Sequence, residues 1–151
     1  MTARVMIDTN ILVYAYDRSE TEKQEAAVRV LDRLVRLGSG VTSPQVLGEF
    51  FLAATKKIPA PLTREEAAGR IRHFCQLWQV LELNEMVVWE TVRGVAEHRF
   101  SYWDAQIWAC ARMHQVGMVF SEDFHQGTVD GVRFVNPLKP GFDMDRVFSL
   151  V

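Results

Sequence analysis

The chain has 151 residues, of which 48% are hydrophobic and 24% charged, a balance typical of a folded globular protein and unlike that of a disordered or collagen-like chain. Its formal net charge of −2 disfavours nucleic-acid binding through a broad basic surface, although a site that brings its own divalent cations can still meet phosphate. Its two cysteines are too few for a disulfide framework. With no leader-like start and no apolar stretch long enough to cross a bilayer, we expect a cytoplasmic protein with a single domain over residues 1–151.

The first half of the chain alternates between strand-like and helix-like patterns. Ser19 and Glu22 have the spacing of a capping box, which predicts the start of a helix that Gly38 ends. Ser43 followed by Pro44 is typical of the beginning of another helix. The predicted elements are a strand at 4–8, a helix at 11–16, a helix from about 19 to 38, a strand at 40–43 and a helix from 44.

The second half continues the alternation. Thr63 and Glu66 form a second capping-box pattern. The predicted elements are a helix from 63, a strand at 79–83, helices from about 84 and from 101 or 102 to 115, and strands at 118–121 and 133–136. On the helix from 84, the inner face is predicted to consist of Val88, Val92, Val95 and Ala96.

Strands separated by helices imply parallel pairing with right-handed crossovers, so we predict a three-layer α/β fold. The core is expected over about 4–137. The tail at 138–151 falls outside the alternation and is a candidate for packing on a partner.

Four acidic residues fall where the predicted sheet presents the carboxyl ends of its strands. Asp8 ends the first strand, and Asp123 follows the fourth. Asp104 lies in the first turn of a helix that begins at the same edge, and Glu49 lies one to two turns into the helix after the second strand. Parallel α/β folds place their sites at this edge, so we expect the four carboxylates to converge.

Each acid also has an ordinary role open to it: a helix cap for Asp8, a capping box for Asp104, a turn for Asp123 and an exposed helix position for Glu49. Their combination is what predicts a site. Two unit charges about 4 Å apart repel by roughly 4 kcal/mol at an effective dielectric constant near 20. Four gathered carboxylates therefore need protons, basic partners or metal ions. Oxygen ligands without a His or Cys pattern predict Mg²⁺ or Mn²⁺, and with them chemistry on phosphate esters.

The order of these motifs resembles that of the PIN-domain nucleases, and above all that of the VapC toxins of bacterial and archaeal toxin–antitoxin pairs. The resemblance covers about Val5 to Pro137. The motifs that carry it are Val5-Met6-Ile7-Asp8-Thr9-Asn10, Glu49 in the helix after Ser43-Pro44, Tyr102-Trp103-Asp104-Ala105, and Ser121-Glu122-Asp123-Phe124.

The resemblance implies a sheet with strand order 3-2-1-4-5 and a Mg²⁺- or Mn²⁺-dependent endoribonuclease that acts on RNA, is inhibited by a small antitoxin protein and forms a homodimer. Position by position, Asp8, Glu49, Asp104 and Asp123 match the acidic metal site, and Asn10 and Ser121 match its supporting polar residues. In this interpretation the three aspartates hold a metal ion, and Glu49 binds a second ion or orients water.

Other features carry less weight. Cys110 and His114 lie one helical turn apart, but two ligands do not make a four-coordinate zinc site. We expect most of the four tryptophans to pack in the core or at an interface, with Trp103, beside Asp104, as the candidate for RNA contact. Phe50 and its neighbour Phe51 are either core residues or an anchor groove for an antitoxin helix.

Other functions stay open at this point. One is a PIN-type nuclease that processes RNA without an antitoxin, and another is a binding module whose acidic site is vestigial. A metal-dependent phosphatase or phosphotransfer domain of the same layout is a remoter third. Titration with Mg²⁺ or Mn²⁺ separates the module from the enzymes, and growth arrest that a small partner relieves identifies the toxin.

Overall fold

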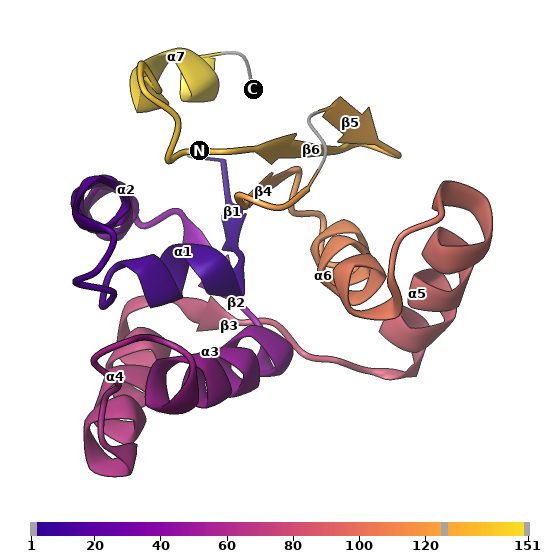
Figure 1. Cartoon of the computed structure of the whole chain (residues 1–151). Coiled ribbons are helices and arrows are strands. Elements are labelled where there is room, and N and C mark those ends of the chain that lie inside the picture. Colours follow the sequence, from indigo (N-terminus) through magenta and orange to yellow (C-terminus); the bar gives the residue numbers. More distant parts are fainter. Residues whose placement is uncertain (1–2, 125–126, 150–151) are drawn as a thin grey trace.

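The computed structural model describes residues 3–124 and 127–149 (Figure 1). Its elements, in chain order, are β1 (Val5–Ile7), α1 (Thr9–Tyr14), α2 (Thr21–Leu37), β2 (Gly40–Thr42), α3 (Pro44–Lys56), α4 (Arg64–Leu77), β3 (Gln79–Val80), α5 (Glu85–His98), α6 (Tyr102–Met113), β4 (Met118–Phe120), β5 (Gly127–Val129), β6 (Val132–Val135) and α7 (Met144–Ser149). None of these helices is long and apolar enough to span a membrane.

The strands form one sheet in the order β3-β2-β1-β4-β6-β5. All neighbouring pairs are parallel except β5 and β6, which form an antiparallel hairpin at the edge. The predicted α/β fold is confirmed, and the predicted fifth strand is β6. The additional strand β5 was not predicted. Its sequence signal was Asp130-Gly131, a pair that suits a tight hairpin turn because both residues have positive φ, 46° and 83°.

Helices cover both faces of the sheet, with α1 and α2 on one side and α5 and α6 on the other (Figure 1). Every residue of β1, β2 and β4 is buried, as expected for parallel strands covered on both faces. Because β1 lies between β2 and β4, the chain leaves β1 and β4 side by side at the centre of the sheet.

The inner face of α5 differs from the predicted one. Val88, Val92 and Val95 are 43%, 47% and 38% exposed, and Ala96 is also exposed. The buried residues of α5 are instead Val87, Thr91 and Gly94. A Cβ atom at Gly94 would lie 2.7 Å from Cζ3 of Trp108, so glycine lets α5 pack closely on the large buried ring of α6. The hydrophobic pattern was misleading because small residues make the α5–α6 contact.

The two predicted capping boxes have different outcomes. Thr63 and Glu66 form theirs at the start of α4, with both reciprocal hydrogen bonds present. The box predicted from Ser19 and Glu22 is wrong, since α2 begins at Thr21 without a side-chain cap. The Ser19 hydroxyl hydrogen-bonds the carboxylate of Asp17 within the preceding turn instead.

The tail packs on the chain's own core. Met144 and Val147 of α7 are buried, and Phe142 contacts Phe120 edge-to-face with ring centroids 5.7 Å apart. An ion pair joins Asp145 to Arg33 of α2. The expectation that the tail would pack on a partner is therefore wrong for these side chains. Between α2 and residues 137–144 runs a groove of about 900 Å³, which none of the four candidate acids lines.

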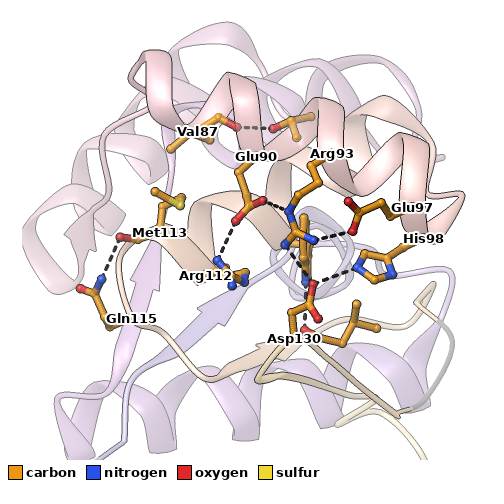
Figure 2. A network of polar contacts seen from close by, with 12 residues as sticks. Val87, Glu90, Arg93, Glu97, His98, Arg112, Met113, Gln115 and Asp130 are labelled. Atoms are coloured by element: carbon orange, nitrogen blue, oxygen red, sulfur yellow. Dashed lines mark hydrogen bonds and ion pairs between the residues drawn. The ribbon is translucent and has the colours of Figure 1, made fainter.

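An ionic network around the nearly buried carboxylate of Glu90 joins α5, α6 and the β5–β6 turn (Figure 2). The carboxylate of Glu90, whose side chain is only 10% exposed, accepts hydrogen bonds from Arg93 and, at 2.6 Å, from Nη1 of Arg112. Arg93 also pairs with Glu97 and with Asp130 of the turn. The network thus attaches the edge hairpin to the helical layer.

Replacing Glu90 with Gln is expected to lower the free energy of unfolding by about 2 kcal/mol, because two partly buried guanidinium groups then lose their common counter-charge. Urea denaturation measures the change. Glu97→Gln is the matched control: this side chain is 55% exposed, so its loss should cost about 0.5 kcal/mol or less. Equal effects of the two substitutions would contradict a stabilising role for the buried carboxylate.

Candidate functional site

Asp8 lies at the junction of β1, α1 and β4. Its backbone N–H donates to the carbonyl of Phe120 at 3.0 Å, which places it against the end of β4. Its carboxylate accepts one hydrogen bond from the Thr9 N–H and one from the Ser121 hydroxyl, both at 2.7 Å. The side chain therefore does cap α1, as its ordinary role suggested, but its second oxygen is turned toward the chain that follows β4.

Ser121 and Asn10 connect Asp8 to Asp123. The Ser121 hydroxyl, almost fully buried, accepts from the Asp123 N–H at 3.1 Å and from the Asn10 side-chain amide at 3.2 Å, while it donates to Asp8. The same amide donates to the Asp123 carboxylate at 3.0 Å, and the Asn10 side-chain oxygen accepts from the Glu122 N–H at 3.2 Å. Hydrogen bonds of Asp8 and Asn10 thus hold the start of α1 against residues 121–123, which follow β4.

Glu49 approaches from α3. The Ser43 hydroxyl caps this helix, and Pro44 begins it, as predicted. Glu49 is partly buried, and its carboxylate lies 3.5 Å from the hydroxyl of Thr9, the residue after Asp8. Gln45, one turn earlier in α3, lowers the pKa of Glu49 against the larger effect of burial.

Asp104 lies in the first turn of α6, where its backbone N–H donates to the capping hydroxyl of Ser101 at 3.3 Å. Its negative charge raises the pKa of both Asp8 and Glu49. Three acids from three separate helices, Asp8 at the cap of α1, Glu49 in α3 and Asp104 in α6, therefore interact electrostatically.

Burial dominates the electrostatics of the site. It raises the pKa of Asp8 to about 6, against the opposing effect of the hydrogen bonds from Ser121 and Thr9, and the charges of Glu49 and Asp104 raise it further. Burial is also the main reason that the pKa of Glu49 is raised. None of the four acids forms an ion pair with another described residue.

The described residues do not contain a closed metal-ligand set: no three of their Asp, Glu, His and Cys side chains are grouped closely enough to hold an ion. Asp8 and Asp123 share Ser121 as a partner, and Asn10 joins Ser121 to the carboxylate of Asp123, whereas Glu49 and Asp104 approach from α3 and α6. The donor set nevertheless fits a hard divalent cation, because it is made of oxygen atoms and a cation would relieve the charge that raises the pKa of Asp8.

One cluster beside the site was not predicted. The Tyr14 hydroxyl donates to Glu122 at 2.8 Å, and the ammonium group of Lys23 pairs with the same carboxylate at 3.1 Å. The charge of Lys23 is therefore paired with Glu122, the residue before Asp123. Glu122 could have been suspected from its place in the motif at 121–124, but Tyr14 and Lys23 come from α1 and α2, and no spacing connects them to it.

The structure also shows where the tryptophans, Phe50, Cys110 and His114 lie. Trp78 and Trp108 are core residues, whereas Trp89 and Trp103 are 63% and 61% exposed. Phe50 is fully buried and therefore belongs to the core. In addition, Cys110 is buried, and a ring nitrogen of His114 hydrogen-bonds the backbone carbonyl of Glu82.

The sequence matches the PIN domain over residues 5–132, which is most of the chain and includes all four acids. The chain belongs to the PIN-domain family. No curated protein matches its sequence.

Solved structures of VapC toxins share the fold of this PIN domain. A toxin–antitoxin complex from Klebsiella pneumoniae matches with a TM-score of 0.64 at 20% identity, covering 88% of this chain and 97% of the other. The VapBC2 complex from Rickettsia felis, bound to a promoter DNA fragment, matches with a TM-score of 0.65 at 15% identity over 87% and 97%. The sarcin–ricin-loop-cleaving toxin VapC20 from Mycobacterium tuberculosis matches with a TM-score of 0.61 at 16% identity over 79% and 89%.

Proposed function

We propose that this PIN domain is a Mg²⁺- or Mn²⁺-dependent endoribonuclease and the toxin of a toxin–antitoxin pair. The observation that carries the proposal is the buried carboxylate of Asp8, whose partner Ser121 also binds the backbone of Asp123. Asp8 is a costly buried acid whose pKa the charges of Glu49 and Asp104 raise further, and it forms no ion pair with a described residue, which favours a cation as its partner. Membership of the family and the VapC-like fold support the same conclusion.

The residues have distinct proposed roles. Asp8, Asp104 and Asp123 hold the metal ion, and Glu49 binds a second ion or orients the attacking water. Asn10 and Ser121 position the carboxylates of Asp8 and Asp123 through the hydrogen bonds described above. A divalent ion held there supplies Lewis acidity, which makes water a better nucleophile and stabilises negative charge on the leaving oxygen of the phosphodiester.

The proposed partners are RNA as substrate, a small antitoxin protein and a second copy of the chain, in the cytoplasm. Structures of the same fold from Klebsiella pneumoniae and Rickettsia felis are toxin–antitoxin complexes, which supports an antitoxin for this chain. Expression of the toxin should arrest growth, and co-expression of its antitoxin should relieve the arrest. A nuclease that processes RNA without an antitoxin would show no such relief.

The direct test is to incubate the purified protein with total RNA in Mn²⁺, Mg²⁺ or EDTA. We expect discrete fragments with either metal and none with EDTA, because the carboxylates alone supply no Lewis acid. Calorimetric titration should show that the protein binds Mn²⁺. A protein that binds neither ion and cleaves no RNA would instead be the binding module with a vestigial site.

A further inference from the structure

Two large aromatic side chains lie exposed immediately before Asp104. Tyr102 and Trp103 begin α6, are 38% and 61% exposed, and contact each other edge-to-face with ring centroids 4.9 Å apart. We call Tyr102 and Trp103 the aromatic pair. The pair therefore presents an aromatic surface that a ligand could cover, directly before one of the candidate acids.

The backbone beneath the aromatic pair is tied to the candidate site. The side chain of Gln45 on α3 donates to the carbonyl of Trp103 at 3.0 Å, and Gln106 on α6 donates to the oxygen of the Gln45 side chain at 2.8 Å. Gln45 lies one turn before Glu49 on the same helix, α3. The helix that carries Glu49 therefore also holds the backbone of Trp103, while the chain links Trp103 directly to Asp104. The rings are exposed, but the backbone that carries them is fixed relative to the acids.

The chemistry of the site limits how it could hold RNA. Its carboxylates repel phosphate, and the net charge of −2 offers no general attraction for a polyanion. Stacking of a nucleobase on an aromatic ring needs no opposite charge, because every base has a π face. An aromatic ring next to Asp104 could thus stack on a base while the phosphate adjoining that base lies among the acids.

We propose that the aromatic pair stacks an unpaired nucleobase next to the phosphodiester bond that is cleaved. This inference rests on the proposed function and adds the residues that hold a base beside the cleaved bond. A base inside an A-form duplex is already stacked on both sides, so only a strand with splayed bases can use the pair. Trp103 and Tyr102 are positioning residues in this proposal, and the acids act on the phosphate.

Binding of a fluorescein-labelled single-stranded RNA in Mg²⁺ tests the proposal, with Asp8→Asn as the parent protein so that the strand stays intact. In this parent, Trp103→Ala is expected to weaken binding at least fivefold, up to about 150-fold, the range that loss of one stacked base corresponds to. Trp103→Phe should recover most of the binding, because phenylalanine also has a π face. A duplex of the same sequence should compete poorly.

Trp89 supplies the matched control, since it is an equally exposed tryptophan on α5 whose indole N–H bonds Glu85 and which has no hydrogen bond to the four acids within the described part of the chain. Trp89→Ala should change binding less than twofold, with every variant checked for the parent's mass in solution. Replacing single nucleotides with abasic ones should locate the stacked base: its removal should weaken binding by the parent but not by Trp103→Ala.

The outcomes separate this inference from the proposed function. If the parent binds RNA and Trp103→Ala binds it equally well, or if Trp89→Ala is equally damaging, stacking by the aromatic pair is overturned while the nuclease proposal stands. If neither the parent nor the wild-type protein binds or cleaves any single-stranded RNA, both are overturned. If Trp103→Phe recovers RNA binding and a single abasic position weakens it, stacking by the aromatic pair is supported.

Discussion

Replacing Asp8 with Asn is expected to reduce metal-dependent RNA cleavage at least about 100-fold. Loss of a group that merely supports a metal ligand typically costs 10–100-fold, and Asp8 is proposed to be a ligand itself. The substitution keeps the shape of the side chain, so the fold should persist. The measurement is the initial rate of fragment formation from RNA in Mn²⁺, with protein that shows the wild-type circular dichroism spectrum.

Asp145→Asn, purified in the same way, is the control for this experiment. Asp145 lies on α7, where it forms an exposed ion pair with Arg33 and contacts none of the candidate acids. The Asp145→Asn variant should cleave RNA at the wild-type rate. That result would also show that a loss of cleavage in Asp8→Asn does not come from the purification. Cleavage by Asp8→Asn at the wild-type rate would refute the assignment of the site.

Asp8→Asn is also expected to stabilise the metal-free protein at neutral pH. Burial raises the pKa of Asp8 from its ordinary 3.8 to about 6, so the folded protein holds this proton more tightly than the unfolded chain does. The free energy of unfolding therefore falls as the pH rises from about 4 to about 6, and the full penalty applies above that range. At 1.36 kcal/mol for each pKa unit, this penalty is about 3 kcal/mol.

Urea denaturation in EDTA checks this prediction. At pH 7.5, Asp8→Asn should be more stable than the wild-type protein by up to about 3 kcal/mol, and the difference should shrink as the pH falls through about 6. Asp145→Asn should follow the wild-type curve. A wild-type advantage at pH 7.5, or a difference independent of pH, would show that the carboxylate of Asp8 is not penalised by burial.

Much of this fold could be predicted from the sequence because the signals are local. Asp8 follows a short apolar strand, and Ser43-Pro44 and Thr63 mark helix starts through contacts with residues a few positions away. Alternating strands and helices then imply parallel pairing, which places the ends of β1 and β4 at one edge. The convergence of Asp8 and Asp123 was thus a consequence of order along the chain.

What the tertiary structure alone decided depends on contacts between distant residues. The period of α5 favoured Val88 and Val92 as inner residues, but the outcome was set by Gly94 against Trp108, a packing contact between two helices. In the same way, no pattern in the sequence connects Lys23 to Glu122.

The sequence by itself determined which elements form and which chemical groups they carry to one edge of the sheet, because helix caps and apolar periods act within a few residues. Only the tertiary structure decided that Asp8 is buried, that Ser121 and Asn10 bridge it to Asp123, and that Trp103 is left exposed. Burial and the pKa that follows from it depend on everything packed around a group, and residues far away in the chain supply most of that packing.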